Sequence, residues 1–201
     1  VRSARDEDLI ILLRSGGGSA LLPYPIDGIT LADKQTVTRL LLRSGATIRE
    51  LNTMRRHLSQ IKGGRLAQLA FPAQVISLIL SDVVGDSLED IASGPTAPDP
   101  SRYADCGEII GRYNLHDKLS LTIRETLRRG ANGSIPDTPK AGDPMFAKVQ
   151  NIIVGSNRIA LEAARGYAET LGYHTPISSC VIDGECRVVA KAQAAMIKEM
   201  L

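Results

Sequence analysis

The residues of this chain best suited to bind an anion stand directly behind an apolar run. Residues 9–13 are all Leu or Ile, and a turn rich in glycine and serine follows at once. Glycines let the backbone approach a ligand closely and adopt positive φ, serines add hydroxyl donors, and a following helix would aim free N–H groups at the same spot. We therefore expect a phosphate or carboxylate here, although a flexible turn fits the same residues. The expected binding residues are Ser15, Gly16, Gly17, Gly18 and Ser19.

Two carboxylates, Asp82 and Asp86, stand four positions apart where a second apolar run, residues 74–81, ends. Mg²⁺ favours one or two carboxylates together with water and phosphate oxygens. A carboxylate in this place can instead accept a proton from a substrate hydroxyl. The structural alternative is that Asp82 caps backbone amides in the turn. The pair is therefore a candidate for a metal site or a general base.

The main basic cluster lies at residues 55–65, where Lys62 stands directly before two glycines. Arg and Lys can hold phosphate or carboxylate oxygens, Arg in a bidentate fashion. Because the glycines would let a helix begin close to a ligand, Lys62 is the strongest candidate, ahead of Arg55 and His57. A solvated helix face is the alternative for the whole run.

Short apolar runs alternate with amphipathic stretches along the chain, which predicts an α/β domain, three-layered and Rossmann-like, with a largely parallel sheet. Apolar runs such as residues 9–13 are typical of strands buried on both faces of the sheet. We expect strands at 9–13, 74–82, 151–154 and 174–182. We expect helices at 30–44, with Leu31, Val37, Leu40 and Leu41 on one apolar face, and at 47–57, 65–70, 101–113, 116–129, 158–171 and from 186 onward.

Ligands of open α/β sheets bind at the carboxyl ends of the strands. Three expected strand ends carry small or polar residues: the loop at 15–19, the turn that begins at Asp82, and the pair Ser156 and Asn157. Their convergence on one rim is a stronger argument for a site than any single motif.

The composition narrows the class of partner. The chain has 201 residues, of which 43% are hydrophobic and 23% charged, enough to build a core. Aromatic residues make up only 3% and the net charge is +2, which argues against nucleic acid as the main partner. The sequence has no apolar run of about 18 residues, so we expect no membrane span. Three cysteines without a CxxC pair suggest free thiols in a reducing cytoplasm.

Six segments, taken together, resemble the class II glycerate kinases, or glycerate 2-kinases, in the family's order and over nearly the whole chain. They are residues 15–22 (Ser-Gly-Gly-Gly-Ser-Ala-Leu-Leu), 57–67 (His-Leu-Ser-Gln-Ile-Lys-Gly-Gly-Arg-Leu-Ala), 80–86 (Leu-Ser-Asp-Val-Val-Gly-Asp), 91–100 (Ile-Ala-Ser-Gly-Pro-Thr-Ala-Pro-Asp-Pro), 138–144 (Thr-Pro-Lys-Ala-Gly-Asp-Pro) and 154–157 (Val-Gly-Ser-Asn). Each segment alone is weak, and it is their number and order that make the resemblance specific.

The resemblance implies phosphorylation of D-glycerate at its 2-hydroxyl, dependent on ATP and Mg²⁺, in a cleft between two α/β domains. Residues 1–201 match most of the larger, amino-terminal domain. The family's early Gly-Lys-Ala segment would lie before Val1, and its carboxyl-terminal domain would follow Leu201. The chain also opens without Met and closes inside an expected helix. We therefore expect a piece of a longer protein that is inactive alone.

The resemblance also implies roles for the candidate residues. Asp82 would be the Mg²⁺ ligand or the base near the 2-hydroxyl, Asp86 would support it, and Lys62 would neutralise phosphate or carboxylate charge. The loop at 15–19 would hold the glycerate carboxylate or a nucleotide phosphate. Further expected binding residues are Arg55, Ser93, Gly94, Thr96, Ser156 and Asn157, with Ser93, Gly94 and Thr96 forming a second anion-facing loop.

Two other functions stay open at this point. The same loop would serve a non-catalytic domain that binds small anions or sugar phosphates. Some members of the family are labelled hydroxypyruvate reductase, but the sequence has neither the dinucleotide fingerprint GxGxxG with its acidic partner nor the P-loop GxxxxGK[ST]. Whether the protein is a homodimer also stays open.

Overall fold

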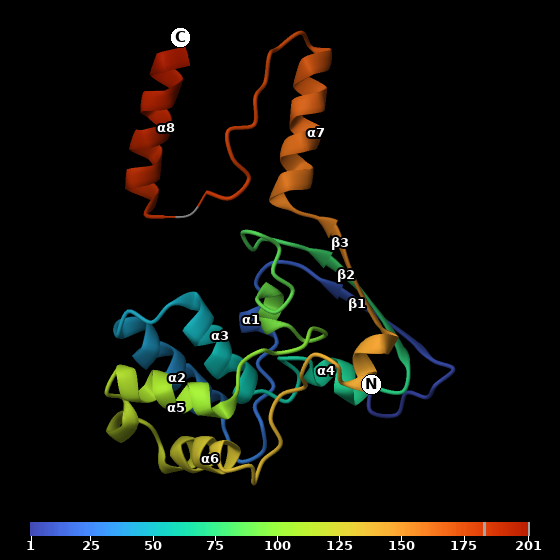
Figure 1. The fold of residues 1–201 in the computed structure, drawn as a ribbon, viewed down its shortest axis with the longest axis vertical. Helices are drawn as coiled ribbons and strands as arrows, with labels where there is room; N and C mark the ends of the chain where they lie inside the picture. The colour runs from blue at the N-terminus through green and yellow to red at the C-terminus, as the bar shows by residue number, and fades with distance from the viewer. Residues whose placement is uncertain (183, 201) are drawn as a thin grey trace.

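Three parallel strands form the sheet that positions the candidate residues (Figure 1). The structure is a computed structural model, and it describes residues 1–182 and 184–200. The strand order is β1 (Leu9–Arg14), β2 (Gln74–Leu80), β3 (Val149–Gly155). The α/β class with a parallel sheet is thus confirmed, and the carboxyl ends of all three strands lie at the same end of the sheet.

The described residues also form eight α-helices and three 3₁₀ turns. The helices are α1 (Gly18–Leu21), α2 (Leu31–Arg43), α3 (Ile48–His57), α4 (Arg65–Ala70), α5 (Tyr103–Arg112), α6 (Leu121–Ala131), α7 (Asn157–Thr170) and α8 (Cys186–Met200). The 3₁₀ turns are η1 (Ile91–Ser93), η2 (His116–Lys118) and η3 (Pro144–Lys148). Thr30 and Thr47 begin α2 and α3 with complete capping boxes, which satisfy amides that the first turn leaves free.

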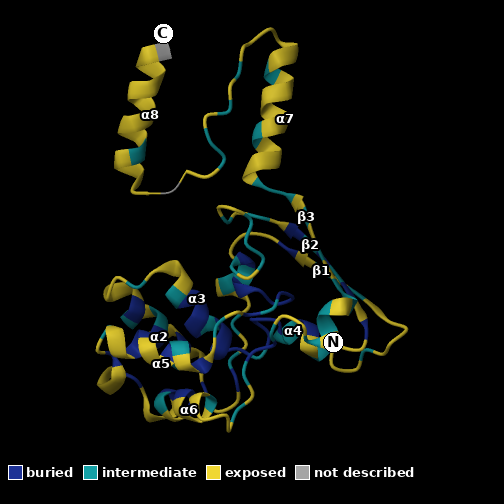
Figure 2. Cartoon of the chain, viewed as in Figure 1, coloured by how far each residue is buried: buried dark blue, intermediate teal, exposed yellow. Residues whose placement is uncertain are grey.

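The largest hydrophobic core lies in a lobe of helices beside the sheet, drawn dark blue in Figure 2. Leu41 of α2, Met54 of α3 and Ile110 of α5 meet there, each at most 4% exposed. Val37 and Leu41 are buried as expected, but Leu31 is 47% exposed. Leu31 lies on a different face of α2, and that face borders a pocket described below.

The sheet is covered on one face and open on the other. Val75, Ser77 and Ile79 of β2 are buried beneath the helices, whereas alternate residues of β1, such as Ile11 and Leu13, are exposed. Burial of residues 9–13 on both faces is therefore a wrong prediction. The reason is visible in Figure 1, where α7 and α8 extend beyond the sheet edge instead of packing on this face.

Two further predictions need correction. The helix expected at 116–129 is instead η2 followed by α6, because the Ser120 hydroxyl accepts from the Ile123 amide and starts a new helix. Residues 174–182 form no strand in the part of the chain that the structure describes. Their apolar residues lie along an extended segment between α7 and α8.

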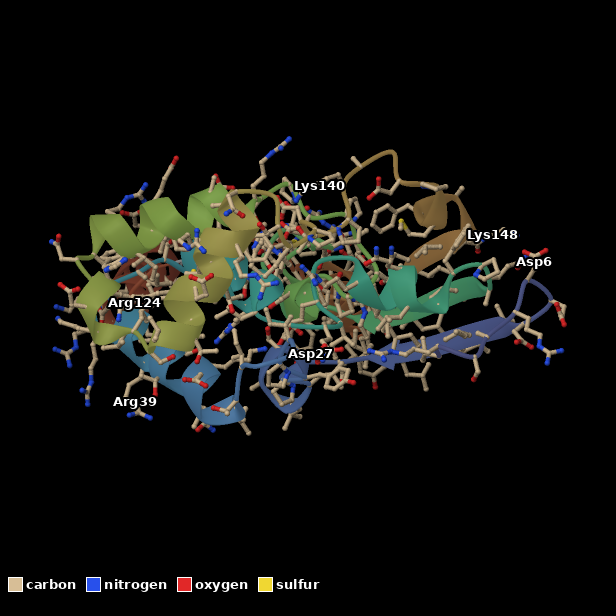
Figure 3. All side chains as sticks on the ribbon, turned by 90° about the horizontal axis from the view of Figure 1, so that it is seen from below. Asp6, Asp27, Arg39, Arg124, Lys140 and Lys148 are labelled. Atoms are coloured by element: carbon tan, nitrogen blue, oxygen red, sulfur yellow. The ribbon has the colours of Figure 1, made fainter. Side chains whose placement is uncertain are left out.

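The two ends of the sheet differ in chemistry. At the amino ends of β1 and β3, Lys148 and Asp6 form an ion pair with Nζ 2.8 Å from Oδ1 (Figure 3). The carboxyl ends carry the polar loops expected from the sequence. A search of the described helices finds none with the length and apolar character to cross a membrane.

Candidate active site

The glycine-rich loop after β1 and the carboxylate after β2 lie against each other. A Cβ added to Gly16 would stand 2.7 Å from Asp82 Oδ2, closer than real Cβ atoms come to another atom. A side chain at this position would therefore displace the Asp82 carboxylate, which shows how closely the loop approaches it. The convergence of Gly16 and Asp82, which the sequence predicts from strand order, is present in the structure.

Ser15, residues 17–20 and the α3 helix line a pocket of about 660 Å³ at this rim. Asp82 and Asp90 form its acidic part, and Arg49 and Arg55 contribute positive charge from α3. Gly17 has φ of 78° and precedes α1, which is a single turn of four residues. So short a helix sums few peptide dipoles, so positive charge must come mainly from side chains.

A second pocket, of about 310 Å³, opens on the other side of Asp82. Its lining includes Asp82, Asp86, Asn157 and Arg158. Among the described residues, no group of three or more His, Cys, Asp or Glu side chains is placed to hold a metal ion. A metal here would therefore have at most two carboxylate ligands and would need oxygens from water or a substrate.

Lys62 is almost completely buried, with 1% of its surface exposed. Its Nζ donates to the Ala92 carbonyl over 3.3 Å. Burial, together with the charges of Lys34 and Arg55, lowers the pKa of Lys62 to about 7. The ammonium thus loses much of its hydration without gaining a carboxylate partner, and the site favours a bound anion that would restore its charge.

The segment predicted as a second anion-facing loop is buried beneath the first. Ser93 and Thr96 are fully buried, and the Ser93 and Gly94 carbonyls accept from the amides of the two glycines that follow Lys62. The Ser93 hydroxyl lies 2.5 Å from that of Ser19. These residues therefore support the first loop from below, and an anion in the pocket would not reach Thr96.

The buried side chain of Arg14 connects the segment around Ser93 to all three strands. Arg14 donates to the Ser77 hydroxyl over 3.0 Å and, over 3.3 Å, to the Ile91 carbonyl and the Asn151 side chain. Asn151 in turn accepts from the Thr96 hydroxyl over 2.6 Å. Burial lowers the pKa of Arg14 to about 10. This network holds η1 under the glycine loop.

The residues after β3 have local roles. The Ser156 hydroxyl accepts from the Ile159 amide and caps α7, which leaves its own O–H free to donate. Asn157 donates to the Cys180 carbonyl over 3.1 Å and lines the smaller pocket. Of the two, Asn157 is the one that lines this pocket.

His57 belongs to the packing of α3. It is completely buried, with Nδ1 2.9 Å from the Thr53 carbonyl and Nε2 2.9 Å from Asp137 Oδ1. Burial is the main influence on its pKa, which is lowered. The ring also meets Tyr103 edge-on at 4.7 Å. This histidine therefore fixes the end of α3 that carries Arg55.

Sequence reasoning missed three polar residues around the pockets. Asn52 links the site by donating to Asp90 and accepting from Ser93. Lys34 is a buried cation on α2, and Arg39 of the same helix lines a third pocket. All three residues lie in amphipathic helices, where polar side chains are usually solvated. The one signal in the sequence was that Lys34 stands three and seven residues before Val37 and Leu41, on the apolar side of its helix.

Three comparisons relate the chain to known proteins. It is 50% identical over 185 residues to a glycerate kinase of Rattus norvegicus, covering 92% of this chain and 34% of that protein. It is 40% identical to a glycerate 2-kinase of Pyrococcus horikoshii, covering 98% of this chain and 44% of the relative. The solved structure of a glycerate kinase from Thermotoga maritima matches with a TM-score of 0.84 and 36% identity, covering 98% of this chain and 44% of that chain.

The chain thus spans between about a third and a half of the length of these relatives. Its α/β fold is that of the Thermotoga maritima structure. A family model with the description "Domain of unknown function (DUF4147)" matches residues 1–128. Because this match covers more than half of the chain, the chain belongs to the DUF4147 family.

Proposed function

We propose that this chain forms part of a kinase that transfers the terminal phosphate of ATP to the 2-hydroxyl of D-glycerate. The observation that carries the proposal is the packing of Asp82 against Gly16, which places a carboxylate beside an anion-binding loop. Similarity to proteins named glycerate kinase and glycerate 2-kinase supports the same activity. A kinase needs a nucleotide and a small-molecule acceptor, and the pockets at this rim are of suitable size.

We propose further that residues 1–201 are most of the larger, amino-terminal domain of a two-domain enzyme. The chain covers only 34% to 44% of the relatives described above. In this arrangement the rim supplies one wall of a cleft and a second domain supplies the other. The chain alone is then expected to bind ligand weakly and to have no turnover.

Phosphoryl transfer depends on positioning and on neutralising the charge of the transferred group. Lys62 and Arg55 provide positive charge beside the glycine loop, whose backbone and serine hydroxyls position an anionic oxygen. Asp82 lies where it can accept the proton of the substrate hydroxyl or hold a divalent cation. Asp86, on the same pocket wall, adds negative charge that favours either role.

The donor set at Asp82 and Asp86 fits Mg²⁺, which binds through one or two carboxylates and keeps other positions for water and phosphate oxygens. Both carboxylates border one open pocket, and the described residues add no third acidic ligand. When bound, the ion would neutralise charge on the nucleotide phosphates. The contribution of the chain itself is to hold Asp82 in place through Gly16.

A kinase assay on the full-length gene product tests the proposal. D-glycerate, ATP and Mg²⁺ should give 2-phosphoglycerate, and omission of glycerate should abolish ADP release. Binding of glycerate and ATP without turnover would replace the kinase with a non-catalytic binding protein. Consumption of NADH with hydroxypyruvate would instead identify a reductase.

A further inference from the structure

A third pocket, of about 560 Å³, lies between the glycine loop and α2. One wall is a single face of α2, whose lining residues recur at the three- and four-residue spacing of one helix side. Leu31 and Leu42 lie on this face and are 47% and 58% exposed, whereas Lys34 is buried where the face borders the core-facing residues Val37 and Leu41. Lys34 therefore lies between the hydrophobic core and the pocket.

Positive charge converges in this pocket from two helices and the turn after α3. Lys34, Arg55 and Lys62 all line it, and so does Arg39, which is exposed and points outward from α2 in Figure 3. None of the lining residues is an Asp or Glu. Lys34 donates to the Pro23 carbonyl over 2.5 Å, and Lys62 donates to the Ala92 carbonyl over 3.3 Å, so neither has its charge balanced by these neutral partners.

Holding these cations close together destabilises the protein when no anion is bound. Burial, with a contribution from Arg55, lowers the pKa of Lys34 to about 8, and the pKa of Lys62 falls to about 7. Like charges held close in a partly buried pocket repel each other unless an anion enters. A single carboxylate would balance one of the cations, whereas a chain of phosphates would balance three.

We propose that this pocket binds a polyphosphate group, with Lys34, Arg55 and Lys62 as its cationic contacts and Ser19 as a hydroxyl donor. The inference rests on the proposed kinase activity and deepens it, because it assigns the phosphates of the nucleotide to the α2 side of the loop. The other substrate then occupies the side that carries Asp82. Lys34 is thereby a phosphate-binding residue.

The test is isothermal titration calorimetry of the full-length protein at pH 7 with tripolyphosphate, and separately with D-glycerate. Lys34→Met keeps much of the buried stem and removes the charge. It should weaken tripolyphosphate binding about tenfold or more and leave glycerate binding unchanged. Arg43→Met, which removes an exposed cation from the same helix outside the pocket, should change neither affinity.

Three results would overturn the inference: unchanged tripolyphosphate affinity in Lys34→Met, equal losses in Lys34→Met and Arg43→Met, or a selective loss of glycerate binding in Lys34→Met. Circular dichroism verifies the fold of each variant, and Lys62→Met provides a second removal of charge from the pocket if Lys34→Met fails to fold. If the protein binds tripolyphosphate through Lys34 but does not phosphorylate glycerate, the pocket assignment stands and the proposed activity fails.

Discussion

The two sides of the glycine loop differ in charge, because only the Asp82 side carries carboxylates among the described residues, and they are built in different ways. On the α2 side, Lys34 and Lys62 are buried and fixed by packing before any ligand arrives. On the other side, Asp82 is exposed and borders two open pockets. The cationic side is thus organised by the fold, whereas the acidic side keeps its carboxylates free for water, a metal ion or a substrate. A loop that separates these two surfaces suits a reaction that brings a polyanion to a hydroxyl.

The largest expected effect is on the acidic side. Asp82→Asn removes the charge with little change in shape, so it should lower kcat/KM of the full-length kinase by about 10²- to 10⁴-fold. If Asp82 is the metal ligand, the concentration of Mg²⁺ needed for half activity rises as well; if it is the base, only kcat falls. The matched control is Asp117→Asn, at an exposed carboxylate of η2. Full turnover and unaltered Mg²⁺ dependence in Asp82→Asn would remove this residue from the mechanism.

The next effect tests whether the loop positions that carboxylate. In Gly16→Ala the new methyl group meets Asp82 Oδ2 at 2.7 Å, so the carboxylate or the loop must move. A shift of about 1 Å at a reacting group can cost about 100-fold in rate, and we expect a loss of this order in kcat. Gly107→Ala is the control, because nothing lies within 4 Å of its added Cβ. Equal activity in the two variants would show that the contact between loop and carboxylate has no part in catalysis.

The cationic side should affect how the free energy of unfolding depends on pH. The pKa of Lys62 is about 7 in the folded protein and near 10.5 when unfolded. Between these values the unfolded chain binds more protons, so the contribution of Lys62 to stability rises with pH. Lys62→Met removes this dependence and should raise the free energy of unfolding at pH 7 by about 4 kcal/mol, because each unit of pKa difference corresponds to about 1.4 kcal/mol.

Urea unfolding of wild type and Lys62→Met at pH 7 and pH 9.5 measures this effect. The difference between the two proteins should shrink at the higher pH, where Lys62 is largely neutral when folded. Lys118→Met, at an exposed lysine of η2, should show no such convergence. If Lys62→Met is less stable than wild type at both pH values, the buried charge of Lys62 does not destabilise the folded protein.

The sequence was sufficient for those parts of the fold and site that depend on local pattern. The apolar runs predict β1, β2 and β3, the expected helices at 30–44 and 47–57 match α2 and α3, and the common end of parallel strands brings Gly16 to Asp82. These features need only short segments and the topology of a parallel sheet.

Features that depend on which surfaces meet were not predictable in this way. Leu31 was expected on the apolar face of α2, but regular helical spacing places it away from Val37 and Leu41, on the pocket wall. Lys34 looks like a solvated lysine until α2 and the loop enclose it. Ser93 and Thr96 read as ligand contacts because nothing local shows that the glycine loop covers them. The sequence of residues 9–13 also does not show that one face of the sheet is uncovered, because its apolar pattern fits a strand buried on either one or two faces.

The smallest expected effect concerns the third strand end, where Asn157 lines the smaller pocket but Ser156 does not. The Ser156 hydroxyl accepts from the Ile159 amide and begins α7. Loss of such a cap costs about 1 kcal/mol, so Ser156→Ala should lower the free energy of unfolding by this amount in urea titrations while KM for ATP and glycerate stays within about twofold. Ser178→Ala, outside any helix cap, is the control for loss of a hydroxyl. If Ser156→Ala instead raises KM strongly at unchanged stability, the third strand end contacts a substrate, and the site extends beyond the two surfaces that flank the glycine loop.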